Sequence, residues 1–250
     1  MIENRAFLYG EVLFVTMRVY NSSILGLKRH QNQMKWQIEN YFLKRELTFD
    51  EEQFLIKQFA SIQVSKPNEI IRMSVYLENF DGLVFEKINL EDLKFHLSNR
   101  DFIERDNIRL KSFQNPFRTG VIPNFKYANY LPSFYLRSEL NKDDFDDVLF
   151  LDNELVVEAS TSNILFEKDG SYFSPKLSNY HGSTIQTLEK VLNIKFCEIN
   201  INDIKQFDFA FLLNCANIIM NIRNIDKHEF QVNNKKAIDI KKHYLASVDK

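Results

Sequence analysis

The sequence predicts an α+β protein of two domains. Both halves of the chain combine segments in which apolar residues recur at helical spacing with short aromatic and β-branched runs that are typical of strands. Between the halves, residues 113–125 (FQNPFRTGVIPNF) carry two prolines and one glycine, which favours an interdomain connection. A length of 250 residues suits two modest domains. We therefore expect an N-terminal α/β domain at residues 1–114, a linker at 115–125 and a C-terminal domain at 126–250.

The elements of the N-terminal half alternate between the two patterns. Residues 7–20 are rich in aromatic and β-branched residues and predict a strand or a strand pair. Residues 27–44 have an amphipathic helical pattern, and residues 49–63 begin with acidic residues, which a helix N-terminus favours. Residues 71–78 and 82–88 predict two strands around a turn.

The C-terminal half shows the same mixture. It predicts a helix at residues 130–140, three strands between residues 146 and 174, a helix at 184–192 and further strands at 195–223. Neither a long heptad pattern nor an internal repeat is present, so the sequence argues against a coiled coil or a solenoid.

Composition excludes several classes of partner. With a formal net charge of −2 and a pI near 6.2, the chain has no global positive field for nucleic acid or for an anionic membrane, and we expect neither as a partner. The two cysteines lack metal-ligand spacing and suit a reducing compartment, and we expect no metal site. The N-terminus lacks the apolar stretch of a signal peptide, so we expect a cytoplasmic protein.

Short motifs follow one another in an informative order. The pattern K-x-x-N-Y begins at Lys126, E-x-x-x-x-N-I-L begins 32 positions later at Glu158, and a Gly-x-Thr that opens a predicted helix begins at Gly182. Each motif alone is a weak signal, but the ordered set resembles the class IV, or fold-type IV, pyridoxal-phosphate (PLP) enzymes. These include branched-chain aminotransferases, D-amino acid aminotransferases and 4-amino-4-deoxychorismate lyases. The resemblance covers nearly the whole chain.

The resemblance implies a fold, a cofactor and two central residues. The fold would be a small N-terminal α/β sandwich and a larger C-terminal mixed α/β pseudo-barrel, in a homodimer. Lys126 would carry PLP as a Schiff base and then act as a general base, because a lysine amine forms an imine with the PLP aldehyde and is released when a substrate amine replaces it. Glu158 would keep the pyridine nitrogen protonated, since an opposite charge nearby favours the charged form. In isolation, each of these two residues would be an ordinary surface charge.

The resemblance also implies a phosphate site. Helix N-termini hold phosphate through free backbone N–H groups, and Ser183 and Thr184 follow Gly182 at such a position. Ser162 and Asn163, in and after the loop that follows Glu158, also belong to the expected cofactor-binding set. Without the resemblance, this glycine and the two residues after it would be read as an ordinary helix cap.

Two arginines of the family pattern are missing. Gln33 stands where the family places an arginine for the phosphate, and Ile185 replaces a second arginine. A neutral amide donates to phosphate without the charge-assisted contact, which is roughly twice as strong as a neutral hydrogen bond. Gln33 is therefore included among the expected cofactor-binding residues, and Arg29, one helical turn earlier, is a further candidate.

Substrate-side residues separate the possible reactions. Residues 211–222 (FLLNCANIIMNI) resemble the lyase branch, so Asn214 and Cys215 favour a lyase that releases pyruvate and p-aminobenzoate for folate synthesis. Tyr9 and Arg18 are the other candidates for substrate contact, and each also has a structural interpretation. Residues 75–85 lack the arginine that lyases and D-amino acid aminotransferases usually offer to a substrate carboxylate, which argues against the lyase. A branched-chain or D-amino acid aminotransferase is therefore the alternative, and a non-catalytic homologue with weakened PLP binding is a third.

Overall fold

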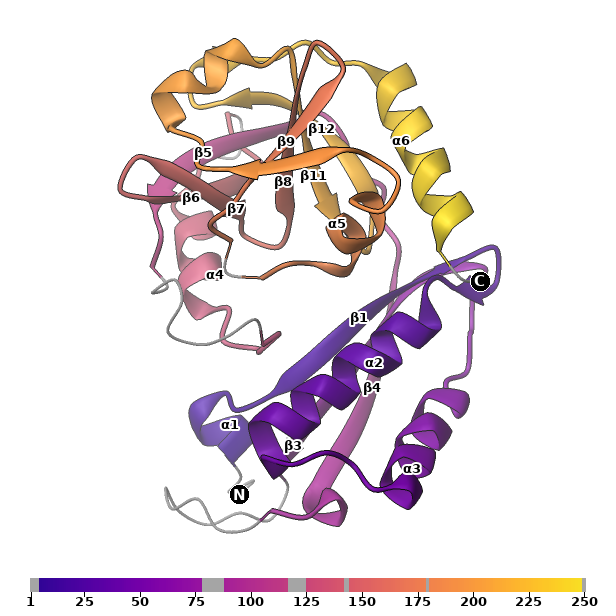
Figure 1. Cartoon of the computed structure of the whole chain (residues 1–250). Coiled ribbons are helices and arrows are strands. Elements are labelled where there is room, and N and C mark those ends of the chain that lie inside the picture. Colours follow the sequence, from indigo (N-terminus) through magenta and orange to yellow (C-terminus); the bar gives the residue numbers. More distant parts are fainter. Residues whose placement is uncertain (1–4, 78–87, 117–124, 142–143, 179, 249–250) are drawn as a thin grey trace. The chain divides into compact units, whose positions relative to one another are not determined.

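The computed structural model describes residues 5–77, 88–116, 125–141, 144–178 and 180–248 (Figure 1). Among these residues, no helix has the length and apolar character needed to cross a membrane.

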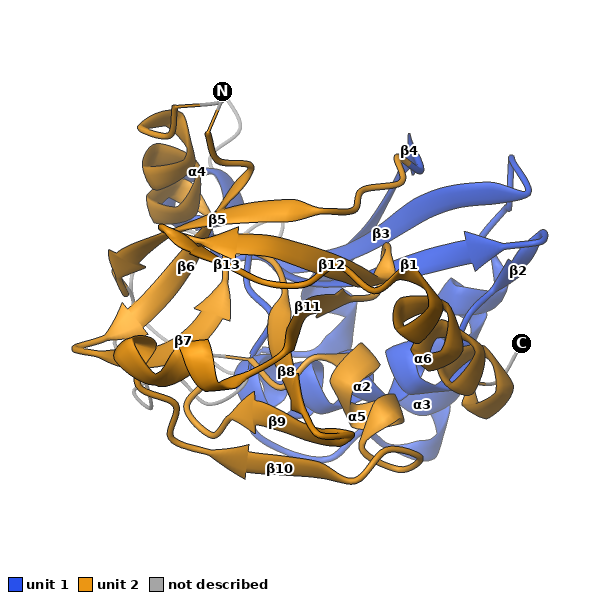
Figure 2. Cartoon of the chain, turned by 90° about the horizontal axis from the view of Figure 1, so that it is seen from above, with its two compact units in different colours: residues 1–102, 125–129, 249–250 blue, residues 103–124, 130–248 orange. Residues whose placement is uncertain are grey.

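The chain forms two compact units, coloured separately in Figure 2. The first comprises residues 1–102, 125–129 and 249–250, and the second comprises residues 103–124 and 130–248. A short segment from the middle of the sequence therefore belongs to the first unit although the residues on either side of it belong to the second.

The first unit is built on an antiparallel sheet with the strand order β2-β1-β3-β4. Its strands are β1 (Leu13–Tyr20), β2 (Ser23–Ile24), β3 (Asn68–Leu77) and β4 (Leu93–Asp101). Alternate residues of β1, including Val15 and Met17, are buried in the main core of this unit. Because side chains alternate across a strand, Phe14 and Thr16 lie on the opposite face of the sheet.

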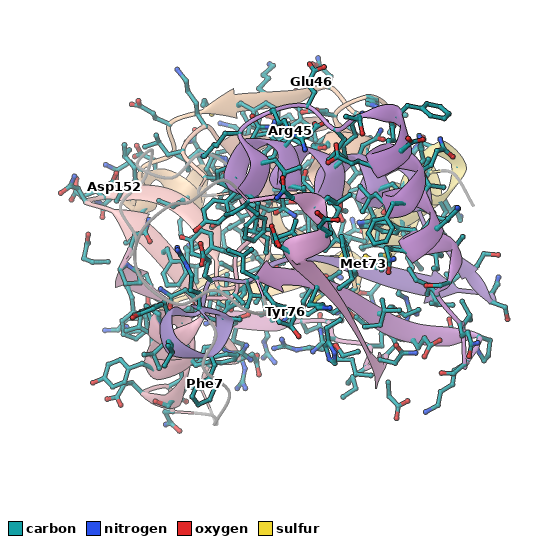
Figure 3. The ribbon with its side chains drawn as sticks, turned by 90° about the horizontal axis from the view of Figure 1, so that it is seen from below. Phe7, Arg45, Glu46, Met73, Tyr76 and Asp152 are labelled. Carbon is teal, nitrogen blue, oxygen red and sulfur yellow. The ribbon has the colours of Figure 1, made fainter. Side chains whose placement is uncertain are left out.

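Helices of the first unit cover the core face of this sheet. They are α2 (Leu27–Gln37), a π-helical continuation of α2 (Ile38–Leu43), α3 (Phe49–Ala60) and a short 3-10 turn (Leu90–Asp92), whereas α1 (Arg5–Tyr9) contacts β3 outside the main core. Met34 on α2 and Phe59 on α3 pack with Met73 of β3, and all three are almost fully buried. Phe7 on α1, in contrast, lies exposed at the periphery (Figure 3).

Residues 125–129 attach to the start of β1. The Phe14 N–H donates to the Lys126 carbonyl at 2.9 Å, and the Ala128 N–H donates to the Val12 carbonyl at 2.9 Å. These backbone hydrogen bonds extend the sheet by a short additional segment, which explains why the segment belongs to the first unit.

The second unit is built on a nine-stranded mixed sheet. Eight strands follow the order β10-β9-β8-β11-β12-β5-β6-β7, and β13 pairs with β12. The strands are β5 (Ile108–Gln114), β6 (Asp147–Asp152), β7 (Leu155–Ala159), β8 (Asn163–Lys168), β9 (Ser171–Pro175), β10 (Ile194–Cys197), β11 (Phe209–Asn214), β12 (Ile218–Ile225) and β13 (His228–Glu229). The helices are α4 (Leu131–Ser138), α5 (Ser183–Leu188), a 3-10 segment (Ile201–Gln206) and α6 (Asn234–Ser247).

Most predicted elements are present, with several differences. The expected strand at residues 7–20 begins only at Leu13, because Arg5–Tyr9 form α1. The strands β4 and β5 and the helix α6 were not predicted. Residues 82–87 of the expected strand at 82–88 and most of the expected linker at 115–125 lie outside the described residues.

The division into units also differs from the expected domain limits. The first unit ends at residue 102, before the expected limit at 114, because β5 pairs with β6 and β12 of the second unit. Residues 126–129, expected at the start of the C-terminal domain, belong to the first unit because of their pairing with β1.

The N-terminus of α3 has a complete capping box. The Thr48 hydroxyl accepts from the Glu51 N–H at 3.4 Å, and the Glu51 carboxylate accepts from the Thr48 N–H at 2.8 Å. Arg45, labelled in Figure 3, donates to both carboxylate oxygens of Glu51 at 2.7 Å.

We expect Thr48→Ala to lower the free energy of unfolding by about 1 kcal/mol, because it leaves a backbone N–H without its capping partner. Urea unfolding followed by circular dichroism measures this change. Thr48→Ser keeps the hydroxyl and should stay close to the parent protein; equal losses in both variants would contradict this role of the cap.

Candidate active site

The main chain of Lys126 is held on both sides in the first unit. Its carbonyl accepts from the Phe14 N–H, and its own N–H donates to the side-chain oxygen of Gln37 at 2.7 Å. The side chain of Lys126 therefore starts from a fixed point on the sheet.

The amine of Lys126 lies near an aromatic ring that also contacts an arginine. Its Nζ is 5.4 Å from the centroid of the Phe14 ring, and the guanidinium carbon of Arg72 is 3.9 Å from the same centroid. Aromatic faces attract cations through their quadrupole. The arrangement gathers two positive charges around one ring, where an anionic group of a ligand would be attracted.

The helix α2 presents three polar side chains at spacings that place them on one face: His30, Gln33 and Gln37. His30 and Gln37 are buried. Burial, followed by the positive charges of Lys126 and Arg29, lowers the pKa of His30 to about 3. His30 is therefore a neutral imidazole at physiological pH.

In the second unit, Asn163 joins the expected pyridine-binding glutamate to the turn before α5. Its amide nitrogen donates to the Tyr180 carbonyl at 2.7 Å and lies 3.4 Å from the Glu158 carboxylate. Its oxygen accepts from the Gly182 N–H at 3.0 Å. A Cβ atom at Gly182 would come within 2.6 Å of this oxygen, so the close approach requires glycine. Asn163 thus positions both Glu158 and the start of α5.

Tyr180 adds a neutral hydroxyl to this group. Burial raises its pKa above the ordinary value, and Cys215, Tyr130 and Glu158 act in the same direction through their negative charge when ionised. Tyr180 therefore remains a phenol, able to donate a hydrogen bond, at neutral pH. Tyr180 and the three residues that affect its pKa come from four separate parts of the sequence of the second unit.

Two buried polar atoms suit an anionic ligand. Among the described residues, the Thr184 hydroxyl and the Gln33 amide nitrogen have no hydrogen-bond partner, although both atoms are buried. An unsatisfied buried polar group costs about 1–3 kcal/mol, so such groups call for an explanation. Each can donate to a phosphate oxygen. Ser183 follows Gly182 in the first turn of α5. The donor set of each unit therefore fits part of a phosphate-bearing cofactor.

The expected residues Ser162 and Asn214 contact each other. The Asn214 amide nitrogen donates to the Ser162 hydroxyl at 2.8 Å, and its oxygen accepts from the N–H groups of Ala216 and Asn217. Just beyond this turn, Ile218 has a φ of 67°, which is a strained conformation for a β-branched residue. The Asn214 side chain therefore organises the turn between β11 and β12.

The expected substrate residues of the first unit lie on α1 and β1. Tyr9 is on α1 and is mostly exposed. Arg18 is buried on β1, where it donates to the Asn68 side chain at 3.3 Å and lies over the Phe102 ring. These contacts favour a structural role for Arg18.

Comparison with known proteins identifies the family. The model of the amino-transferase class IV family matches residues 12–225. The chain belongs to this family. It is an enzyme of the PLP-dependent aminotransferase and lyase class, as the motifs around Lys126 and Glu158 predicted. A curated relative, "Probable branched-chain-amino-acid aminotransferase" of Rickettsia felis, is 26% identical over 235 residues, which are 87% of this chain and 79% of the relative.

Solved structures confirm the predicted fold-type IV architecture. The 4-amino-4-deoxychorismate lyase of Pseudomonas aeruginosa matches with a TM-score of 0.77 and 21% identity, over 96% of this chain and 93% of that one. The branched-chain aminotransferase of the archaeon Thermoproteus uzoniensis, solved with norvaline, matches with a TM-score of 0.80 and 18% identity, over 100% and 93% of the two chains.

Four residues around the expected site were not selected from the sequence. Phe14 was interpreted as a core aromatic and Arg72 appeared only as a member of a predicted strand. The register that brings them together is not visible in one segment alone. Tyr180 directly precedes the His181-Gly182 motif, which was a usable signal. Gln37 lies one helical turn after Gln33, but nothing in the sequence shows its contact with Lys126.

We expect Thr184→Val to have opposite effects on PLP affinity and on the stability of the PLP-free protein. Affinity should fall because the hydroxyl is lost as a donor, whereas stability should stay equal or rise by up to about 1 kcal/mol because an unsatisfied group is removed. Fluorescence titration with PLP and urea unfolding measure the two quantities.

The matched control for this prediction is Thr187→Val on the same helix. The Thr187 hydroxyl donates to the Ser183 carbonyl at 2.8 Å, so its removal should destabilise the protein by about 1 kcal/mol. If both variants lost the same stability, the Thr184 hydroxyl would have a partner within the protein and the argument for a ligand would fail.

We expect His30→Gln to reduce the acid sensitivity of the PLP-free protein. Because the pKa of His30 is near 3 when folded and about 6.5 when unfolded, protons bind the unfolded state preferentially below pH 6.5. This histidine alone should cost about 2 kcal/mol at pH 5 relative to pH 7. Urea unfolding at the two pH values tests this, and an equal pH dependence in parent and variant would contradict it.

Proposed function

We propose that the chain is a PLP-dependent amino-acid aminotransferase in which Lys126 carries the cofactor and moves the α-proton of the substrate. The curated relatives that it matches are described as probable branched-chain-amino-acid aminotransferases. They favour this activity over the lyase that the sequence motifs suggested first. The observation that carries the proposal is the meeting of the Lys126 amine and the Arg72 guanidinium at the Phe14 ring.

Each residue has a distinct task in this proposal. When bound, PLP supplies an aldehyde that condenses with amines and a ring that withdraws electrons. The Lys126 amine takes a proton from the substrate α-carbon as a general base, a task that typically contributes 10²–10⁴-fold to the rate. Arg72 attracts the substrate carboxylate. Glu158 keeps the pyridine nitrogen protonated, held in place by its contact with Asn163.

The phosphate would be held without the arginine at position 33 that the family pattern contains. Ser183 and Thr184 offer the first turn of α5, and Gln33 offers an amide N–H. Neutral donors form weaker hydrogen bonds to phosphate than arginine does. We therefore propose that binding of the cofactor depends strongly on its covalent link to Lys126.

A lyase acting on 4-amino-4-deoxychorismate is the second candidate. The observation in its favour is Asn214, which matches the lyase pattern and organises the turn beside Ser162. Both candidates need a proton moved at a carbon next to the amine, so Lys126 serves either one. We extend the proposal to a homodimer, as the resemblance implies.

We expect Lys126→Ala and Lys126→Arg to abolish the PLP adduct and to lower activity by at least about 10³-fold, because neither side chain can form the imine or act as the base. Borohydride reduction of the protein with PLP, followed by peptide mass spectrometry, locates the adduct. Lys126→Arg keeps the positive charge and so controls for electrostatic effects on folding.

Substrate assays then choose between the reactions. The parent enzyme should convert branched-chain or D-amino acids with 2-oxoglutarate, and should release no pyruvate from 4-amino-4-deoxychorismate. The opposite result would select the lyase. An absence of any adduct at Lys126 in the parent protein would overturn both enzymes and leave the non-catalytic homologue.

A further inference from the structure

Gln37 occupies an unusual position next to the catalytic segment of the first unit. It is the last residue of α2, directly before the π-helical segment Ile38–Leu43, and it is fully buried. π-helical turns are rare in proteins, and those that occur often lie at functional sites. A fully buried glutamine requires partners for both ends of its amide.

Both ends of the Gln37 amide contact the main chain around Lys126. Its oxygen accepts from the Lys126 N–H at 2.7 Å, and its nitrogen donates to the Phe14 carbonyl at 3.4 Å. The Phe14 N–H in turn donates to the Lys126 carbonyl at 2.9 Å. One side chain therefore connects α2, β1 and the segment that carries the lysine.

The same part of the helix also fixes the residue before the lysine. Phe125 packs against Trp36, with ring centroids 4.8 Å apart, and against Tyr41 at 5.5 Å. Trp36 directly precedes Gln37 in the sequence, and Tyr41 follows it by four positions. Side-chain packing therefore holds residue 125, while the amide holds the main chain of the next residue.

We propose that Gln37 is a positioning residue that fixes the backbone of Lys126 and so the place of its amine. The inference rests on the proposed role of Lys126. Catalytic groups must be held within a fraction of an ångström of the productive geometry, and a loss of such support lowers the rate without removing the catalytic group. Gln37 itself touches neither substrate nor cofactor in this role.

Three variants of the full chain test the proposal. Gln37→Met has a similar shape but removes both hydrogen bonds. Gln37→Glu keeps an acceptor for the Lys126 N–H. Gln58→Met, on α3, makes the same substitution at a glutamine on the neighbouring helix and serves as the matched control.

The first measurement is hydrogen exchange at the Lys126 amide in protein without added PLP. We expect Gln37→Met to exchange about tenfold faster there, the factor that corresponds to about 1.4 kcal/mol. Gln37→Glu should recover most of the protection, and Gln58→Met should match the parent. This measurement does not depend on the cofactor, so it separates a failure of this inference from a failure of the proposed function.

The second measurement is steady-state kinetics with borohydride trapping. Gln37→Met should lower kcat by about 10–100-fold with a smaller change in KM, and should slow trapping of PLP at Lys126, because misplacement of a reacting group by about 1 Å can cost about 10²-fold. Gln37→Glu should restore part of the rate. This recovery distinguishes positioning from a general loss of stability.

Specific results would overturn the inference. Unchanged exchange at Lys126 in Gln37→Met would show that the amide does not hold the segment. Equal acceleration of exchange throughout the first unit, or no recovery in Gln37→Glu, would show a purely structural role. If Gln37→Met does not fold, Gln37→Asn replaces it, because its shorter side chain withdraws the amide from both partners and the same outcomes apply.

Discussion

The attachment of residues 125–129 to β1 is the constraint on which the surroundings of the lysine depend. Backbone hydrogen bonds join this segment to Val12 and Phe14, and the side-chain oxygen of Gln37 accepts from the backbone N–H of Lys126. A lysine side chain has several rotatable bonds, so an amine on a mobile segment would sample a large volume. Fixing the main chain removes part of that freedom before any ligand binds.

A comparable device operates in the second unit with a different residue. Asn163 is a single side chain that contacts the Glu158 carboxylate, the Tyr180 carbonyl and the Gly182 N–H. A carboxylate that stabilises a charge during a reaction must be oriented in advance by other groups, because the free energy of reorienting it would reduce that stabilisation. In both units an amide side chain joins two main-chain segments, and each amide is adjacent to a residue with a proposed chemical role.

The sequence predicted the fold and the family because these depend on ordered motifs. The patterns that begin at Lys126, Glu158 and Gly182 retain their spacing, and strands such as β1 and β3 have strong β-propensity. The strand β4 was missed although Leu93, Phe95 and Leu97 alternate with polar residues.

Other features depend on contacts that no local pattern contains. Gln37 appears in the sequence as one more polar residue of an amphipathic helix, yet its partner lies 89 positions away. The preference for a lyase rested on Asn214 and Cys215, whereas the matched curated relatives are described as probable branched-chain-amino-acid aminotransferases. The structure explains part of this ambiguity, because Asn214 uses its amide to organise its own turn. Asn214 therefore has a role in loop architecture that does not depend on a substrate.

Because residues 125–129 belong to the first unit although they follow part of the second in the sequence, the order of synthesis affects folding. During synthesis on the ribosome, residues 1–102 emerge before Phe125 is available to pack against Trp36 and Tyr41. Until then, the buried amide at position 37 lacks its main-chain partner on that segment. Synthesis of the intervening stretch must therefore precede completion of the first unit, and a fragment severed near the Pro/Gly-rich stretch would be an incomplete module rather than an autonomous one.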